Sequence, residues 1–347
     1  MNQEAEKFIR FTKSLPILDV RSPAEFKKGH VPGAHSFPLF LDEERHEVGI
    51  CYKQQGRDAA VELGLKIVGP KLADFVTRAK KIAPEGELGI YCWRGGMRSG
   101  SMGWLLRTAG MKVHVLPGGY KAYRKWVQDE MRRPRKFLIL GGLTGSGKTE
   151  VLQELVQLGE AVIDLEGLAR HKGSAFGNLE GGLQPRTEFF ENLIVEQLIN
   201  MDPDQPIWLE DESRSIGQVF IDKDLFDQMR SSPLVVLERS MEDRVKHLVE
   251  LYGTLPIQAL ADAFRRIERR LGGQHVKAAI EAIEQGDLET ASKIALVYYD
   301  KAYTFGLTKR PTVPRLTVDG SGMDHRAVAK KLKTQTDQWI KEKNLFA

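Results

Sequence analysis

The sequence predicts an α/β protein with a doubly wound parallel sheet in its N-terminal part, a second α/β unit after it, and a helical C-terminal region. Three observations predict this fold class. Short apolar runs alternate with helical patterns in residues 15–131 and again in 137–240, as expected where helices connect parallel strands. Each part has a glycine-rich loop directly after one apolar run, at the strand end where such sheets bind ligands. From residue 241 onward the apolar spacing is that of helices.

Length indicates two domains. A chain of 347 residues is longer than one ordinary core supports, and a charged, proline-containing junction at 132–136 divides it. We therefore expect a first domain over 1–133 and a second over 134–347. The second should have its core at about 137–240 and a mainly helical part at about 241–347.

Composition and cysteine content indicate the cellular compartment of the protein. Hydrophobic residues make up 41% of the chain and charged residues 28%, and no apolar run approaches the length of a membrane span. The first ten residues are charged and lack the apolar segment of a secretory signal. Two cysteines, Cys51 and Cys92, are too few for a disulfide framework and suit a reducing compartment. We expect a soluble, cytoplasmic protein.

Positive charge is concentrated in the first part of the chain. Residues 1–136 contain 25 lysines and arginines against 15 aspartates and glutamates, whereas the whole chain has 51 against 47. This surplus suits an anionic partner such as nucleic acid, although a solvated basic surface explains it equally well. The candidate RNA contacts, with a solvated surface as the alternative for each, lie at the junction and in a helix expected over 256–271: Arg132, Arg133, Arg265 and Arg269.

Strands and helices alternate along the first domain. A short strand at 15–20 contains Asp19 near its end, and Ser22 can cap a helix that begins at Pro23. After turn-rich residues 29–34 the patterns predict helices at 58–63 and 69–81, a strand at 88–91, a helix at 99–108, a strand at 112–116 and a helix to about 131.

Cys92 is the first candidate catalytic residue, because it opens a glycine-rich loop between the strand at 88–91 and the next helix. Backbone N–H groups at a helix N-terminus favour the nucleophilic thiolate. Arg98 adds positive charge and can bind a tetrahedral oxyanion through two N–H groups. The alternative is a buried structural cysteine. Supporting residues at the same sheet edge are Asp19, Arg94, Gly95, Gly96 and Ser99.

The second domain begins with a phosphate-binding signature. A strand at 137–140 leads into a complete Gly-x4-Gly-Lys-Thr loop before a helix. Glycines let backbone N–H groups surround a phosphate, the lysine neutralises it, and the threonine hydroxyl can bind magnesium. The residues of this predicted phosphate or diphosphate site are Gly142, Gly145, Gly147, Lys148 and Thr149.

An acidic run supplies candidate magnesium ligands for this loop. Glu210, Asp211 and Glu212 follow a buried strand at 207–209, and a carboxylate at such a strand end holds magnesium in P-loop proteins. We assign Thr149 and Asp211 to a candidate magnesium ion, with Glu210 in support, and the sequence leaves open which of the three acidic residues faces the metal. Strand alternation would put Glu210 and Glu212 on one face and Asp211 on the other.

The other elements expected in the second domain complete an α/β core and a helical region. Strands are expected at 161–164 and 234–237, the latter being the last core strand, and helices at 187–200, 241–252, 256–271, 274–285, 288–299 and 324–344.

The first domain resembles the rhodanese family. The resemblance spans residues 14–130 and rests on Asp19-Val20-Arg21, Glu25-Phe26, the turn at 29–34 and the Cys92 loop. In that family the loop cysteine carries sulfur or selenium. Five residues separate Cys92 from Arg98, one more than in many single-domain sulfurtransferases. The longer loop is similar to that of cell-cycle phosphatases, so phosphatase chemistry is an alternative.

Nearly the whole chain resembles the tRNA 2-selenouridine synthase family. This resemblance rests on the order of a rhodanese domain before a P-loop domain and on motifs in both domains. Those of the second domain lie at 141–149, 164–168, 171–177 and 210–213. The resemblance implies that selenium from selenophosphate replaces the sulfur of 2-thiouridine at the wobble position in the anticodon region of tRNA. It implies an S-geranyl intermediate made from geranyl diphosphate, and no tightly bound cofactor besides the candidate magnesium.

Two other functions fit parts of the sequence. One is a cysteine-dependent phosphatase or sulfurtransferase fused to an NTPase domain, and the other is a catalytically silent RNA-binding regulator. A catalytically silent regulator would not need a thiol, yet Cys92 is present between a strand and a helix, which counts against that function. We expect the P-loop to serve geranylation, because it can neutralise a leaving diphosphate, and Cys92 to serve selenation.

Overall fold

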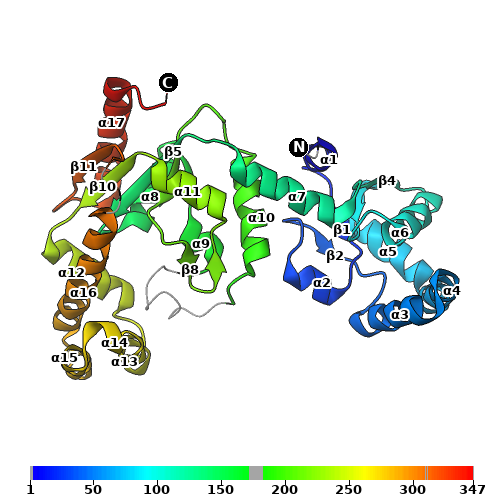
Figure 1. Cartoon of the computed structure of the whole chain (residues 1–347), viewed down its shortest axis with the longest axis horizontal. Coiled ribbons are helices and arrows are strands. Elements are labelled where there is room, and N and C mark those ends of the chain that lie inside the picture. The colour runs from blue at the N-terminus through cyan, green and yellow to red at the C-terminus, as the bar shows by residue number, and fades with distance from the viewer. Residues whose placement is uncertain (1–2, 172–182, 309, 311, 347) are drawn as a thin grey trace. The chain divides into compact units, whose positions relative to one another are not determined.

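The computed structural model describes residues 3–171, 183–308, 310 and 312–346. The chain forms two compact units, the first made of residues 1–132 with 191–196 and the second of 133–190 with 197–347. Both are α/β units built on parallel sheets (Figure 1). The predicted fold class is therefore confirmed.

The first unit has a four-stranded parallel sheet of order β2-β1-β3-β4. Its register places Asp19 opposite Tyr91, so the residues that follow β1 and β3 meet at one edge. Apolar side chains of both strands, such as Leu18 and Ile90, are fully buried in the core. The strands are β1 (Ile17–Asp19), β2 (His35–Ser36), β3 (Glu87–Tyr91) and β4 (Lys112–Val115).

Helices surround this sheet, and the one that begins just after the cysteine loop, α6, packs against β4 and α5. The helices of the first unit are α1 (Gln3–Phe11), α2 (Pro23–Lys28), α3 (Asp42–Gln55), α4 (Arg57–Val68), a 3₁₀ helix (Gly69–Lys71), α5 (Leu72–Ile82), α6 (Met97–Thr108) and α7 (Gly119–Arg132).

The second unit has a five-stranded parallel sheet of order β11-β10-β5-β7-β6 and a two-stranded antiparallel pair, β8 with β9. The strand that leads into the P-loop, β5, is the central strand and fully buried, so the loop begins at the middle of the sheet. The strands are β5 (Phe137–Gly142), β6 (Ala161–Ile163), β7 (Ile207–Glu210), β8 (Ser215–Ile216), β9 (Val219–Phe220), β10 (Leu234–Glu238) and β11 (Arg315–Asp319).

Helices α8 and α17 pack against each other beside this sheet (Figure 1). They share a core with the strands, to which Leu152 and Leu332 contribute. The helices are α8 (Lys148–Gln157), α9 (Leu165–Ala169), α10 (Thr187–Leu198), α11 (Lys223–Ser231), α12 (Met241–Tyr252), α13 (Ile257–Arg266), α14 (Glu268–Leu271), α15 (Gly273–Glu284), α16 (Leu288–Thr308) and α17 (His325–Lys343).

Two sequence-based expectations about elements are wrong. The strand at 234–237 is not the last of the core, because β11 pairs with β10 from Leu234↔Arg315 to Glu238↔Asp319. In β11 only Val318 is buried, so this edge strand has no continuous apolar run in the sequence. The helix expected over 256–271 is two helices, α13 and α14, separated at Ile267.

Among the helices that the structure describes, none is long and apolar enough to cross a membrane.

Candidate active site

Cys92 lies at the carboxyl edge of the first sheet, directly after β3. Its side chain is buried, with 3% of its surface exposed. The Sγ atom is 3.1 Å from the hydroxyl oxygen of Ser99, and the backbone N–H groups of Arg94 and Ser99 also point to it. The loop therefore surrounds the sulfur with hydrogen-bond donors, as the sequence predicts for a thiolate.

These neighbours change the acidity of the thiol. Burial raises the pKa of Cys92. This effect is outweighed by hydrogen bonds from the Ser99 hydroxyl and from the backbone N–H groups of Ser99 and Arg94, together with the positive charge of Arg98. The net effect is a pKa below the usual value for a cysteine. A larger fraction of Cys92 is consequently the nucleophilic thiolate at neutral pH.

The cysteine loop is held by the start of α7. The carbonyl oxygens of Cys92 and Trp93 accept hydrogen bonds from the backbone N–H groups of Tyr120 (2.8 Å) and Lys121 (2.9 Å). Gly119 has a φ of +60°, and a Cβ atom on it would lie 2.3 Å from the carbonyl oxygen of Cys92. Only glycine fits at this position, so a segment distant in sequence sets the shape of the loop.

Arg98 does not lie free above the sulfur. Its guanidinium binds the carboxylate of Glu25 through two contacts, Nη1 to Oε2 at 2.6 Å and Nη2 to Oε1 at 3.2 Å. The two-point grip that was expected for an oxyanion is thus made with Glu25. Glu25 was missed as a site residue, although its capping box with Ser22 marks it as an ordered position.

Asp19 lies in a buried ion pair beside the cysteine loop. It is fully buried and forms an ion pair with Arg21, whose Nη2 lies 2.6 Å from Oδ2. The hydroxyl of Tyr91 donates to the same oxygen at 2.8 Å, and the Arg21 guanidinium stacks 3.8 Å above the Tyr120 ring. Asp19 therefore supports the site by joining the strand before the cysteine to α7.

The P-loop connects β5 to α8 as the sequence predicts. Gly147 caps α8 with a φ of +73°, and the Lys148 ammonium donates to the carbonyl of Gly142 at 3.0 Å. The backbone N–H of Gly142 donates to the hydroxyl of Tyr303 at 2.8 Å. Arg244 donates to the carbonyl of Thr144 at 2.8 Å, so side chains from α16 and α12 hold the loop.

Three glutamates lie together beside Thr149. The Thr149 hydroxyl donates to Glu210 at 3.0 Å and contacts Glu166 at 3.4 Å. Oxygens of Glu166, Glu210 and Glu212 all lie within 4.8 Å of one another. Burial and the neighbouring carboxylates raise the pKa of Glu166 and Glu210 to about 8 and that of Glu212 to about 7.

This donor set fits a magnesium ion. Crowded, buried carboxylates are unfavourable as anions, and a divalent cation would relieve their repulsion. Magnesium prefers oxygen ligands, and carboxylates with a threonine hydroxyl provide them. Glu166 was missed by sequence reasoning, because it lies far from the acidic run in the chain.

The assignment of magnesium to Asp211 needs correction. Its Oδ1 lies 2.7 Å from Arg310 and 3.5 Å from Arg230, so this carboxylate is engaged in a buried ion-pair cluster. Strand alternation explains the difference, because Glu210 and Glu212 join Glu166 and Asp211 turns the other way. Glu210, hydrogen-bonded to Thr149, is the better candidate ligand.

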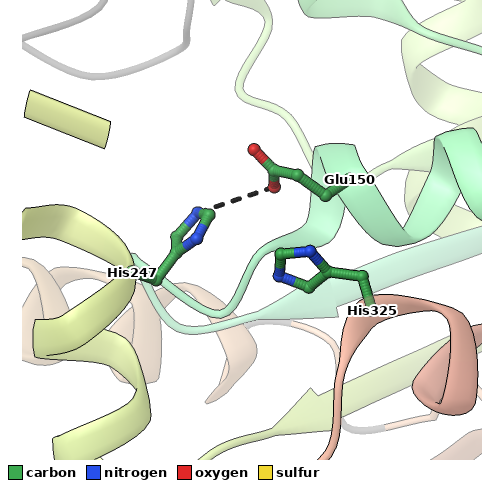
Figure 2. A group of neighbouring side chains, drawn as sticks. All are labelled: Glu150, His247 and His325. Atoms are coloured by element: carbon green, nitrogen blue, oxygen red, sulfur yellow. Dashed lines mark ion pairs between the residues drawn. The ribbon is translucent and has the colours of Figure 1, made fainter. Parts of the chain in front are cut away.

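A second group of potential ligands also borders the P-loop. Figure 2 shows Glu150 of α8, His247 of α12 and His325 of α17 turned toward one another. The Nε2 atom of His247 lies 3.5 Å from a carboxylate oxygen of Glu150, and the His325 ring lies against Gly147. Three separate helices supply these side chains, so the spacing of the residues in the sequence does not predict the group. Two imidazoles and a carboxylate are donors that suit a transition metal.

The four predicted RNA contacts differ in exposure and lie on different elements. Arg132 is exposed at the end of α7, and Arg133 follows it half-buried. Arg265 and Arg269 are exposed but lie on two helices, α13 and α14, rather than on the single helix expected over 256–271. Arg265 also pairs with Asp262 at 2.6 Å. Most of the motif at 171–177 lies outside the described residues.

A reactive cysteine loop on one parallel sheet and a P-loop on another define a rhodanese-like domain fused to a P-loop domain. Comparison with protein families agrees with this class. Residues 1–125 match the rhodanese-like domain, and residues 135–337 match the model described as "tRNA 2-selenouridine synthase AAA domain". The chain belongs to the tRNA 2-selenouridine synthase family, which confirms the resemblance seen in the sequence.

Individual relatives support this membership. A tRNA 2-selenouridine synthase of Marinobacter nauticus is 37% identical, covering 86% of this chain and 90% of that protein. One from Cupriavidus necator is 35% identical, covering 94% of this chain and 96% of that protein. A crystal structure of the N-terminal domain of a putative ATP/GTP binding protein from Clostridium difficile is 40% identical over 34% of this chain and 95% of that one, with a TM-score of 0.32.

Proposed function

We propose that this chain is a tRNA 2-selenouridine synthase that exchanges the sulfur of 2-thiouridine for selenium through an S-geranyl intermediate. The observation that carries the proposal is the buried Cys92 thiol, whose hydrogen bonds lower its pKa, in a chain that also has a P-loop with carboxylates beside Thr149. The first site suits a soft nucleophile, and the second suits an anionic leaving group. Family membership supplies the tRNA substrate.

Geranylation is assigned to the P-loop. The sulfur of 2-thiouridine attacks C1 of geranyl diphosphate, the C1–O bond breaks, and diphosphate leaves with the bonding electrons. Backbone N–H groups of the loop and the Lys148 ammonium would bind that diphosphate. Glu210 would orient the Thr149 hydroxyl through the 3.0 Å hydrogen bond. A magnesium ion held by Thr149 and Glu210 would add positive charge at the departing diphosphate.

Selenation is assigned to the Cys92 loop. Selenophosphate is the selenium source, and the Cys92 thiolate would attack its phosphorus atom, so that the P–Se bond breaks and selenide leaves with the bonding electrons. Selenide then attacks C2 of the uracil ring, the C2–S bond breaks and geranylthiolate leaves, while water hydrolyses the phosphorylated cysteine and releases phosphate. The backbone N–H groups that face the sulfur would also face the oxygens of selenophosphate. The Arg98 guanidinium would keep a positive charge beside the loop.

The ion pair of Arg98 argues against the phosphatase alternative. A cysteine-dependent phosphatase needs its arginine to bind substrate phosphate through two N–H groups, whereas here Glu25 accepts from both terminal nitrogens. Hydrolysis of a generic aryl phosphate is the outcome that would favour the alternative.

The two assignments can be tested with reciprocal variants. The protein is incubated with 2-thiouridine tRNA, geranyl diphosphate and selenophosphate, and the digested nucleosides are analysed by mass spectrometry. Lys148→Ala should fail to geranylate but should still convert tRNA that is supplied already geranylated. Cys92→Ser should accumulate S-geranyl tRNA, and Cys51→Ser should behave like the wild type. Normal selenium incorporation by Cys92→Ser, or geranylation by Lys148→Ala at the wild-type rate, would reject the corresponding assignment.

A further inference from the structure

A cavity of about 690 Å³ adjoins the cysteine loop within the first unit. We call it the α3–α4 cavity, because these two helices form most of its wall and the start of α6 completes it. Met97 and Arg98 line the cavity and are the first two residues of α6, which follows the cysteine loop. The α3–α4 cavity therefore adjoins the loop of the predicted selenation site, although Cys92 itself does not line it.

Apolar side chains of the α3–α4 cavity are unusually exposed. Ile50 on α3 is 41% exposed, Leu65 on α4 is 66% exposed, and Met97 on α6 is 53% exposed. Single exposed apolar residues are ordinary, but several that line one hollow indicate a binding surface. The volume is also typical of pockets that enclose small organic ligands.

The charged side chains that line the α3–α4 cavity are cationic, and one of them, Arg98, is paired with Glu25. Arginines and lysines surround the apolar wall, and none of the residues that line it is acidic: the cationic ones are Arg45, Lys53, Arg57, Arg94 and Arg98. An apolar chain attached to a polyanion is complementary to such a surface. A purely apolar ligand would leave the cationic rim unused, and a simple anion would leave the apolar wall exposed to water.

We propose that the α3–α4 cavity binds the isoprenoid chain of S-geranyl-2-thiouridine while its basic rim binds phosphates of the tRNA. This inference rests on the proposed function, which supplies the S-geranyl intermediate. Burial of the ten-carbon chain beside Met97 would place the adjoining C2–S bond at the Cys92 loop. The cavity would then select geranylated tRNA over unmodified tRNA for selenation, because each buried methylene adds to affinity.

Binding can be measured without any turnover. Anticodon stem-loop RNAs that carry S-methyl-2-thiouridine or S-geranyl-2-thiouridine are titrated with the full-length protein by fluorescence anisotropy. The wild type should bind the S-geranyl RNA at least about tenfold more tightly. Leu65→Glu should abolish this preference, because a carboxylate would enter the apolar wall. Leu72→Glu is the matched control on α5, outside the cavity and 38% exposed, and should keep the preference.

Turnover then separates this inference from the function on which it rests. Wild-type protein is supplied with S-geranyl tRNA and selenophosphate, and Leu65→Glu should raise KM about tenfold while geranylation of 2-thiouridine tRNA continues. If the wild type does not convert S-geranyl tRNA, the proposed function fails. If it does, and Leu65→Glu matches the wild type in both assays, the cavity inference is overturned alone. Loss of a protein dimer in Leu65→Glu, with the S-geranyl preference intact, would instead assign the cavity to self-association.

Discussion

Glu25 and Arg98 form an ion pair with two contacts, at 2.6 and 3.2 Å, across 73 positions of sequence. Burial raises the pKa of Glu25, but the hydrogen bond and charge of Arg98 outweigh it and lower that pKa. The carboxylate therefore stays ionised at neutral pH, and α2 fixes the position of the guanidinium beside the cysteine loop.

This pair predicts that Arg98 cannot be exchanged for another cation. Arg98→Lys keeps the charge but cannot make both hydrogen bonds to Glu25, because an ammonium does not reproduce the planar pair of N–H groups. We expect selenation of S-geranyl tRNA to fall at least about tenfold, with geranylation unchanged. Glu25→Gln should have a smaller effect. Wild-type selenation by Arg98→Lys would show that the paired geometry has no role.

Ser99 should control the pH dependence of selenation. Since its hydrogen bond lowers the pKa of Cys92, Ser99→Ala should raise that pKa toward the usual value of a cysteine. The thiolate would then form at higher pH, so the rising limb of the selenation rate should shift upward in pH. Thiolate absorbance in the ultraviolet, taken as the difference from Cys92→Ser, measures the same change directly. An unshifted titration curve in Ser99→Ala would contradict the prediction.

Glu210 and Asp211 should respond differently to removal of their charge. Glu210→Gln removes a candidate magnesium ligand, so the magnesium concentration needed for geranylation should rise at least about tenfold, with little effect on folding. Asp211→Asn leaves the charge of buried Arg310 unbalanced and should lower the free energy of unfolding by about 3 kcal/mol. Magnesium titrations and urea unfolding of both variants make the comparison. The opposite pattern would restore Asp211 as the metal ligand.

Binding to tRNA should depend strongly on salt, because phosphates are neutralised by lysine and arginine. The logarithm of the affinity should fall linearly with the logarithm of salt concentration. The double variant Arg265→Glu, Arg269→Glu should reduce the slope by about one for each phosphate that is no longer neutralised. Lys223→Glu on α11, with a side chain 69% exposed, is the control. A flat salt response in the wild type would argue against an RNA substrate.

Gly119 should be more sensitive than other glycines near the site. Gly119→Ala would force a Cβ atom to 2.3 Å from the carbonyl of Cys92 at a positive φ, at a cost of about 2–5 kcal/mol in stability. Gly100→Ala, on α6 with nothing within 4 Å of its added Cβ, should be neutral or slightly stabilising. Urea unfolding and the Cys92 titration test both changes. Equal stability of the two variants would show that the loop and α7 do not need their close approach.

The parts of the site that the sequence predicts are those encoded by neighbouring residues. The Cys92 loop and the P-loop each occupy one short segment after a strand, so their local geometry follows from glycine positions and helix N-termini. Side-chain alternation along β7 also predicts that Glu210 and Asp211 point to opposite faces. The assignment of Asp211 to the metal did not take this into account.

The parts that the sequence did not predict depend on packing between distant segments. Glu25 reaches Arg98 from another helix, and Glu166 reaches Glu210 from α9. Tyr303 meets the P-loop from α16. Tertiary packing creates these interactions, and the spacing of residues in the sequence does not predict them. The edge strand β11 was missed for a related reason, since only one of its side chains is buried.

The pairing of β10 with β11 also has a consequence for the order in which the protein forms. Parallel neighbours need a crossover connection, and the helices α12 to α16 provide it between Leu234 and Arg315. Because α17 (His325–Lys343) follows β11 and packs on α8, the helix that carries Lys148 gains this partner only after α17 has been synthesised. During translation, the phosphate site should therefore mature late, well after the cysteine loop has left the ribosome.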